Sequence, residues 1–242
     1  MSCAAEIVRP MDEPPKLLRA LVPQLLRPET TDAAWDPQRF ATEQIRGLVR
    51  QVFFPGWPRP ARQVVISGIH DAGRVAEVCA RVAIELAAQV RSRVCAVETE
   101  MIRPALLDCL MAQFGANSSS NHATSTPEHR QFGDNLFFVS GEALWASKSG
   151  CYSAEGIGCA LSELRRRFEY TVLHAPPAGI YNQTALMARA SDGIILVLEA
   201  GRTRRLAARQ AAQLLRRANA RLIGTVLNHR MFPVPEAIYR RL

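Results

Sequence analysis

A glycine-bearing turn between a short apolar segment and a long helical pattern is the most chemically suggestive part of the sequence. It reads Gly68-Ile-His-Asp-Ala-Gly73-Arg74-Val75. The spacing matches the phosphate-binding pattern G-x-x-x-x-G-K-[ST], in which the lysine neutralises phosphates and the hydroxyl ligates Mg²⁺. Arg74 and Val75 hold those two positions, and valine has no ligand atom. The sequence therefore predicts a nucleotide-binding shape without ordinary nucleotide chemistry, or a strand-to-helix turn that binds no ligand.

Part of the phosphate-binding apparatus is nevertheless present. Gly68 and Gly73 permit a backbone nest for an anion at the start of a helix. Arg74 offers a planar fork of donors in place of the lysine. We expect any bound ATP to be held without magnesium-dependent hydrolysis.

Two further segment ends carry ionisable side chains. Glu98 and Glu100, two residues apart, could hold Mg²⁺ or orient a nucleophile, or they could form a polar strand end balanced by Arg103. His174 ends Tyr-Thr-Val-Leu-His, where nucleotide hydrolases usually carry a magnesium-anchoring aspartate. A neutral imidazole is a poor ligand for a hard cation, so a hydrogen-bonded structural histidine and no metal are expected there.

A fourth segment ends at Asn228, near where a purine base would lie. Its side chain could hydrogen-bond adenine or cap the turn.

Alternating strands and helices are predicted to position these residues. The expected helices are Pro37–Phe53, Gly73–Gln89, Pro104–Phe114, Ala154–Phe168, Gln183–Ala190 and Thr203–Ala218. The expected strands are Gln63–Ser67, Arg93–Glu98, Leu136–Ser140, Tyr170–His174, Gly193–Glu199 and Arg221–Leu227. Such apolar runs between helices predict an α/β fold with a doubly wound, mostly parallel sheet and helices on both faces. Ligands bind at the carboxyl ends of strands in this class of fold.

Composition sets the limits around this fold. Residues 1–40 are rich in proline and charge and are expected to form a loosely packed arm, with residues 41–242 as the α/β domain. Residues 115–135 are polar and predict a mobile loop. No apolar run is long enough for a membrane span, and acidic residues interrupt the N-terminus where a secretory signal would lie, so a cytoplasmic location is expected. Six scattered cysteines without a C-x-x-C pair predict neither disulfides nor zinc.

The formal net charge is +8, and the basic residues are almost all arginine. Only Lys16 and Lys148 are lysines, so no lysine could replace the one missing from the glycine turn. An arginine excess is compatible with nucleic acid, an anionic membrane surface or an acidic partner. Seven arginines lie on or beside one predicted helix: Arg202, Arg204, Arg205, Arg209, Arg216, Arg217 and Arg221. Those seven do not share one face, so a solvated helix is expected and nucleic acid is not an expected partner.

The ordered segments resemble the bacterial tyrosine kinase family of exopolysaccharide synthesis and export, which belongs to the deviant P-loop ATPases. Family members carry T-S-x-x-x-x-x-G-K-[ST], then D-x-D-x-R-x-P, then D-x-x-I-I-D-T-P-P. The matching segments here are Ser67–Val75, Glu98–Pro104 and Glu169–Pro177, and Asp192–Thr203 is similar to a downstream D-G segment. The resemblance covers about residues 41–232 and implies a P-loop NTPase-like fold of the deviant Walker type.

The same resemblance bears on assembly. Glu43-Gln-Ile-Arg46-Gly-Leu48 is similar to the family's E-x-x-R-x-L helix for ring assembly, which implies self-association through Glu43 and Arg46. The family's second arginine would fall on Val49. The resemblance also implies a partner, the cytoplasmic tail of a membrane chain-length or polysaccharide export protein. It further implies a location peripheral to the inner membrane.

The departures from the family fall on its catalytic positions. Lysine is replaced by Arg74, the metal-binding hydroxyl by Val75 and the third-motif aspartate by His174, while Glu98 and Glu100 lengthen the two acids of the second motif. Family kinases end in a tyrosine cluster that receives phosphate, but this chain has a single tyrosine, Tyr239, near its end.

The leading hypothesis is therefore a catalytically degenerate relative that acts as a scaffold or regulator in exopolysaccharide synthesis or export. One alternative is an atypical active kinase or ATPase. In it, Arg74 would replace lysine, Glu98 or Glu100 would serve the metal or act as base, and Tyr239 would be autophosphorylated. Another alternative is a surface or DNA binder like the partitioning ATPases.

Overall fold

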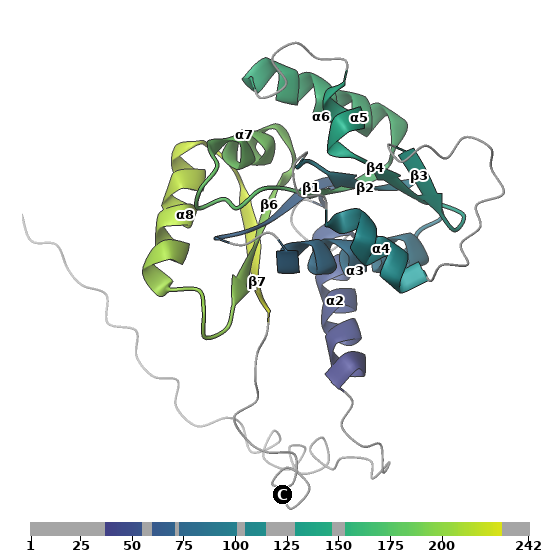
Figure 1. The fold of residues 1–242 in the computed structure, drawn as a ribbon, viewed down its shortest axis with the longest axis horizontal. Helices are drawn as coiled ribbons and strands as arrows, with labels where there is room; N and C mark the ends of the chain where they lie inside the picture. The colour runs from purple at the N-terminus through teal and green to yellow at the C-terminus, as the bar shows by residue number, and fades with distance from the viewer. Residues whose placement is uncertain are drawn as a thin grey trace, which may run out of the picture. The chain divides into compact units, whose positions relative to one another are not determined.

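The protein is described by a computed structural model (Figure 1). The structure describes residues 37–54, 60–70, 73–100, 105–114, 129–146 and 153–228. The predicted N-terminal arm up to residue 36, Arg103 and Tyr239 lie outside the described residues, so those expectations stay predictions. No described helix is long and apolar enough to cross a bilayer.

Helices and strands alternate along the described chain. The helices are α2 (Pro37–Phe53), α3 (Gly73–Gln89), α4 (Leu106–Phe114), α5 (Gly141–Trp145), α6 (Ala154–Arg167), α7 (Asn182–Ala190) and α8 (Arg205–Arg217). The strands are β1 (Gln63–Gly68), β2 (Val94–Glu98), β3 (His129–Phe132), β4 (Leu136–Val139), β5 (Tyr170–His174), β6 (Gly193–Glu199) and β7 (Leu222–Asn228). The six predicted strands and six predicted helices are all found, with ends that differ by at most two residues.

The strands form one sheet in the order β3-β4-β2-β5-β1-β6-β7. Every neighbouring pair is parallel except β3 with β4, which is antiparallel. β1 is completely buried because it lies near the middle of the sheet with helices over both faces. The predicted α/β class with a mostly parallel sheet is confirmed.

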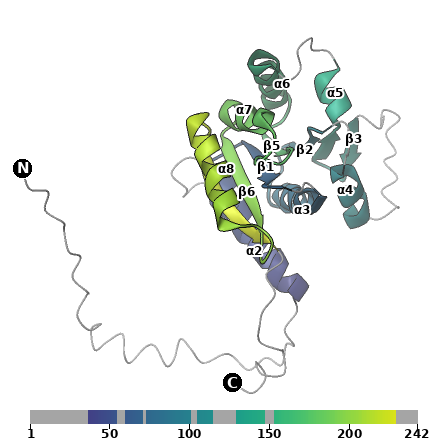
Figure 2. The same ribbon diagram turned by 60° about the vertical axis from the view of Figure 1, so that its left-hand side comes forward.

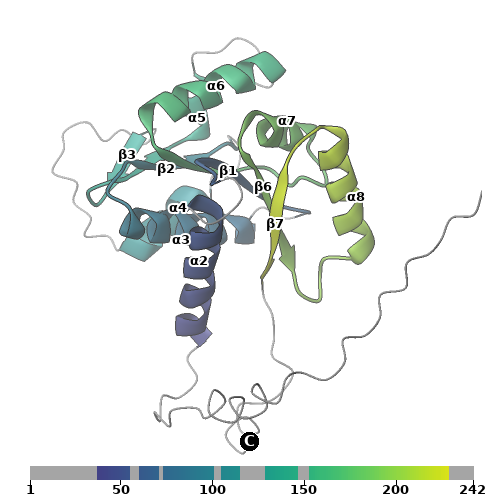
Figure 3. The same ribbon diagram turned by 180° about the vertical axis from the view of Figure 1, so that it is seen from behind.

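Two apolar clusters fill the two faces of the sheet. On one face α2, α3 and α4 pack against residues such as Val64 and Ile66 of β1. On the other face α5, α6, α7 and α8 pack against alternate residues such as Val65 and Leu173. The two helix layers are visible on opposite sides of the sheet in Figure 1 and from behind in Figure 3. The alternation of neighbouring residues between the faces follows from the two-residue period of a strand.

Two elements lie where the sequence did not predict them. β3 falls inside the segment 115–135 that was expected to be a loop, so that expectation is wrong for His129–Phe132. The strand was missed because only its last residue is strongly apolar, and its order comes from pairing with β4. The short helix α5 is begun by Ser140, whose hydroxyl accepts a hydrogen bond from the Ala143 amide, and is too short to show helical periodicity.

Candidate functional site

The carboxyl ends of β1, β5 and β2 lie side by side, and they bring together three of the segments singled out in the sequence. In the sheet register Ile66 of β1 is opposite His174 of β5, and His174 is opposite Glu98 of β2. The glycine turn follows β1 directly. The residues that would act on a nucleotide therefore converge on one edge, where the fold class places its ligands.

Glu98 and His174 contact each other in the protein interior. His174 Nδ1 lies 2.9 Å from Glu98 Oε1 and 3.1 Å from Oε2. Both side chains are completely buried. With Glu98 as the acceptor, Nδ1 of His174 carries the shared hydrogen. The prediction of a hydrogen-bonded structural histidine agrees with this geometry, and its partner is the very acid that was a candidate metal ligand.

The Glu98 carboxylate also holds the backbone that follows β2. Its Oε1 accepts from the Glu100 amide at 3.2 Å. Its Oε2 accepts from the amides of Ala105 and Leu106, at 3.2 and 3.1 Å, where α4 begins. A negative charge at a helix N-terminus satisfies amides that have no partner within the helix and interacts favourably with its dipole. Glu98 thus joins β2, β5 and α4 at one buried point.

A second set of buried hydrogen bonds ties the end of β1 to the segment after β5. The Ser67 hydroxyl donates to the Pro176 carbonyl at 2.6 Å and accepts from the Ala178 amide at 3.0 Å. Thr184 Oγ1 of α7 donates to the same Pro176 carbonyl at 2.7 Å. The Ala178 amide also lies 2.9 Å from the Gly68 carbonyl. The backbone at the start of the glycine turn is therefore fixed to the loop between β5 and α7.

Close approach between these two loops requires a glycine. A Cβ added at Gly179 would lie 2.5 Å from the carbonyl oxygen of Ile69, a separation that real Cβ atoms essentially never show. Nearby, the Thr99 hydroxyl donates to the His174 carbonyl at 2.7 Å, and the Trp145 indole donates to the Thr99 carbonyl at 3.2 Å. The sequence analysis gave no role to Thr99, Trp145, Thr184 or Gly179. Thr99 lies inside a recognised motif, but nothing marked Thr184 or Gly179 beyond their position after Pro176.

Val75 faces the protein core at the position where the pattern requires a metal-binding hydroxyl. It is 2% exposed and belongs to the cluster beneath α3. Arg74 beside it is half-buried. One turn further along α3, burial raises the pKa of the Cys79 thiol well above its usual range, and the nearby Glu98 charge raises it further. The surroundings of Glu98 on the α3 side are thus apolar helix packing.

Two of the described residues of this edge, Val75 and Glu98, offer no free ligand atom to a magnesium ion. Val75 supplies no oxygen, and both oxygens of Glu98 already accept from His174 or from backbone amides. Within the described ranges no three His, Cys, Asp or Glu side chains gather as possible metal ligands. In the same ranges every buried side-chain polar atom has a hydrogen-bond partner. The polar groups at the carboxyl edge are therefore satisfied by one another.

Of the remaining candidate residues, Glu100 contacts Glu98 through its backbone amide, and Asn228 lies apart from the Glu98–His174 contact. Glu100 follows β2 and is half-buried. Asn228 ends β7, which β6 separates from β1, and its carbonyl accepts from the Ala200 amide at 2.9 Å. Only the first residues of the glycine turn are described before α3 begins at Gly73.

The predicted assembly residues of α2 are engaged within the chain. Arg46 NH1 lies 2.6 Å from Glu43 Oε1, and Arg46 Nε lies 2.9 Å from Oε1 of Glu85 on α3. These hydrogen bonds and charges raise the pKa of Arg46. Glu43 is exposed on α2, and Arg46 is half-buried between Glu43 and Glu85 of α3.

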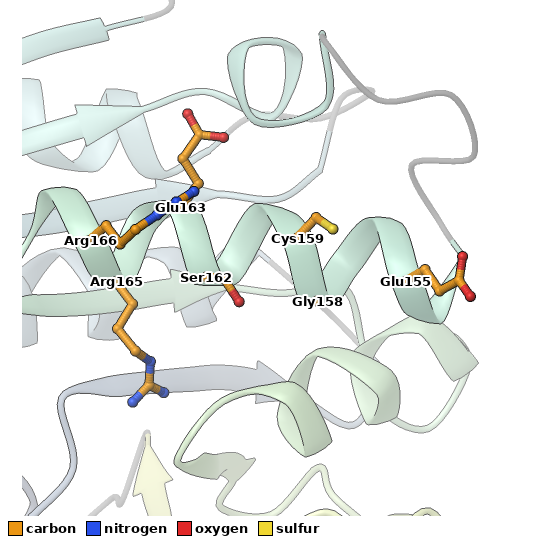
Figure 4. Close-up of a pocket in the computed structure, with 7 residues that line it drawn as sticks. All are labelled: Glu155, Gly158, Cys159, Ser162, Glu163, Arg165 and Arg166. Carbon is orange, nitrogen blue, oxygen red and sulfur yellow. The ribbon is translucent and has the colours of Figure 1, made fainter.

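A shallow hollow lies along α6, away from these residues (Figure 4). Its volume is about 730 Å³, and its described lining comes from α6 alone: Glu155, Gly158, Cys159, Ser162, Glu163, Arg165 and Arg166. It includes none of the residues singled out in the sequence. The hydrogen-bonded carboxyl edge of the sheet therefore remains the candidate site.

Comparison of the sequence with known proteins gives short matches to tyrosine kinases. No protein-family model matches the chain. It is 31% identical over 68 residues to the tyrosine-protein kinase CpsD of Streptococcus agalactiae serotype III, covering 28% of this chain and 29% of that protein. It is 26% identical over 95 residues to CpsD of Streptococcus pneumoniae serotype 4, covering 39% and 42%. The chain thus aligns with less than half the length of these relatives.

Comparison of the fold gives matches over most of the chain. The kinase domain of the Escherichia coli tyrosine kinase ETK superposes with a TM-score of 0.60 at 14% identity, covering 89% of this chain and 90% of that domain. The BceF tyrosine kinase domain gives 0.56 at 19% identity, covering 88% and 87%. The chimerical protein CapA2B2 gives 0.61 at 13%, covering 83% and 88%. At these identities the likeness shows a shared fold.

Proposed function

This chain is a relative of the bacterial tyrosine kinases, which confirms the resemblance seen in its motifs, and from that premise we propose that it works without catalysis. Its role is that of a scaffold or regulator in exopolysaccharide synthesis or export. It occupies the place of a kinase domain in the assembly and does not transfer phosphate.

The observation that carries the proposal is the buried contact between Glu98 and His174. Phosphoryl transfer depends almost entirely on positioning and on neutralising charge with metal ions and basic groups. The acid that would serve the metal is instead paired with an imidazole and with the amides at the start of α4. Using Glu98 for catalysis would require breaking its completely buried hydrogen bonds to His174 and to the backbone amides.

The buried Val75 supports the same conclusion. Val75 packs in the apolar cluster under α3. An apolar core side chain therefore stands where the pattern has a metal-binding hydroxyl. Nucleotide binding itself remains compatible with the residues present. The backbone at Gly68 and Gly73 and the Arg74 guanidinium could hold phosphates, and Asn228 could contact a base, without magnesium-dependent hydrolysis.

The proposed partners follow from the family. The chain would act in the cytoplasm, at the inner face of the membrane, on the cytoplasmic tail of a chain-length or export protein. Self-association would use the outer side of α2, where the ion pairs to Arg46 hold Glu43 and Arg46 in fixed positions. Nucleic acid is not a partner in this proposed function.

Calorimetry and phosphate release with Mg²⁺ and ATP test the proposal. We expect no magnesium-dependent turnover by the full chain, and the same result for Glu100→Gln. As a positive comparison, an intact family kinase is assayed under the same conditions. Turnover by the unaltered chain at the rate of an intact family kinase would overturn the proposal.

Mass spectrometry after incubation with ATP separates this proposal from an atypical active kinase. Phosphate on Tyr239 that disappears in Arg74→Ala would favour the kinase. Arg50→Ala, which removes an exposed arginine from α2, is the matched control and should leave the spectrum unchanged. We expect Tyr239 to be unmodified in all three proteins.

A further inference from the structure

Positive charge is concentrated in one stretch of the chain. Residues 200–228 hold seven arginines and no Lys, His, Asp or Glu. The rest of the chain holds 23 basic and 22 acidic residues, so this stretch accounts for nearly all of the net charge of +8. A general preference for arginine in the sequence does not explain such a local excess.

The fold turns part of this stretch into an ordered surface. α8 packs on the sheet through Ala211 and Leu215 and leaves its other side exposed. Arg205, Arg209 and Arg216 are exposed, and their spacing of four and seven residues places them within about 40° of one another around the helix axis. They form a row about 16 Å long, here called the arginine row. As expected from the sequence, the seven arginines do not all share one face of the helix, but Arg205, Arg209 and Arg216 do.

The arginine row is not neutralised by the described part of the protein. No described carboxylate forms an ion pair with Arg205, Arg209 or Arg216, and the ion pair nearest in the chain joins Arg202 to Glu199 at 3.4 Å. Arg205 lies in the first turn of α8, where the helix dipole disfavours a cation, although Arg216 in the last turn is favourably placed. Local rules broken without compensation point to a role in binding.

Exposed apolar side chains in the same stretch of the chain point to the kind of partner. Leu206 of α8 is 67% exposed and Leu227 of β7 is 56% exposed. Figure 2 shows α8 on the outside of the domain, next to β6. Residues 200–228 contain no Phe, Tyr or Trp that could stack on bases. Exposed leucines beside arginines suit the headgroup region of a bilayer, where basic side chains meet lipid phosphates and apolar ones enter the acyl boundary.

We propose that the arginine row of α8, with Leu206, binds the anionic surface of a lipid bilayer. The contact is peripheral and electrostatic, and it does not depend on whether the chain binds or hydrolyses ATP. It would hold the sheet edge that carries β7 close to the membrane.

Sedimentation of the full chain with lipid vesicles tests the proposal. We expect binding to phosphatidylcholine vesicles that contain about 30% phosphatidylglycerol and none to phosphatidylcholine alone, with binding lost as NaCl rises from about 0.05 M to about 0.5 M. Each arginine near an anionic surface contributes about fivefold in partitioning, so R205Q/R209Q/R216Q should weaken binding on the order of 100-fold. R205K/R209K/R216K keeps the charge and should retain binding.

Matched controls exclude effects of net charge and folding. R50Q/R166Q/R189Q removes three other exposed arginines and should bind vesicles as the unaltered chain does. L206S should bind more weakly at equal charge. Equal loss in R205Q/R209Q/R216Q and R50Q/R166Q/R189Q, or no binding to anionic vesicles by a folded chain, would overturn the proposal. Binding to a DNA duplex tighter than to these vesicles, lost in R205Q/R209Q/R216Q, would also overturn it, in favour of a nucleic-acid surface.

Discussion

Replacing His174 by alanine gives the sharpest test of the interpretation of the candidate site. The change removes a completely buried imidazole and leaves the Glu98 carboxylate without its partner. Loss of one member of a buried pair costs about 3–5 kcal/mol. The backbone amides of Glu100, Ala105 and Leu106 still contact Glu98, so the lower part of that range is expected for the charge. The cavity left by the ring adds about 1–2 kcal/mol.

A conservative variant separates the lost hydrogen bond from the lost volume. In His174→Asn the side-chain amide nitrogen can take the position of Nδ1 and donate to Glu98, so it should cost about 2 kcal/mol less than His174→Ala. His174→Asp should cost at least as much as alanine, because it places a second carboxylate against Glu98. Glu98→Gln in the same chain should relieve that repulsion.

Urea unfolding followed by circular dichroism measures these free energies. For a domain of this size, each kcal/mol also lowers the melting temperature by about 2–4 °C. A loss below about 1 kcal/mol for His174→Ala, with an unchanged dependence on urea, would refute the interpretation of Glu98 and His174 as a structural pair. Equal losses for alanine and asparagine would show that volume alone matters.

Three further changes test other parts of the site. Gly179→Ala should destabilise by about 1–3 kcal/mol because its Cβ meets the Ile69 carbonyl, whereas Gly47→Ala in α2, which meets no atom within 4 Å, should stabilise by about 0.5–1 kcal/mol in the same unfolding assay. Val75→Thr should cost about 1–3 kcal/mol by burying a hydroxyl and should not by itself create Mg²⁺ binding, as isothermal calorimetry would reveal. Burial alone would raise the pKa of Asp192, but hydrogen bonds from two backbone amides and from Arg165 lower it. Its stabilisation is therefore complete above the unfolded value near 3.9 and is lost as pH falls below that. The destabilisation by Asp192→Asn should be constant between about pH 6 and pH 8 and shrink towards pH 3, and a gap that stays constant to pH 3 would contradict this assignment.

Much of the fold was predictable because burial imposes clear patterns on its elements. β1, β5 and β6 are short apolar runs, and α2 and α3 show helical spacing that predicts both of their ends. β3 was not predictable, since its residues are mostly polar and the strand depends on its pairing with β4. Local sequence does not encode such a partner.

The candidate site was predictable in its members and not in its contacts. Glu98 and His174 were both placed at strand ends, but their contact requires β2 to lie beside β5, and the order of strands in a sheet does not follow the order along the chain. For the arginine row, the arrangement was predictable and the functional meaning was not. Its spacing is present in the sequence, but its meaning depends on which side of α8 the sheet covers.

The buried junction at Glu98 also constrains how this chain can change over evolutionary time. One carboxylate serves β2, β5 and the start of α4 together, so neither Glu98 nor His174 can be exchanged alone without loss of stability. An aspartate at position 174 would place a second carboxylate against Glu98, so it would need a compensating change at 98. Selection for a stable protein is therefore enough to keep this pair of residues, independently of any activity at this edge of the sheet.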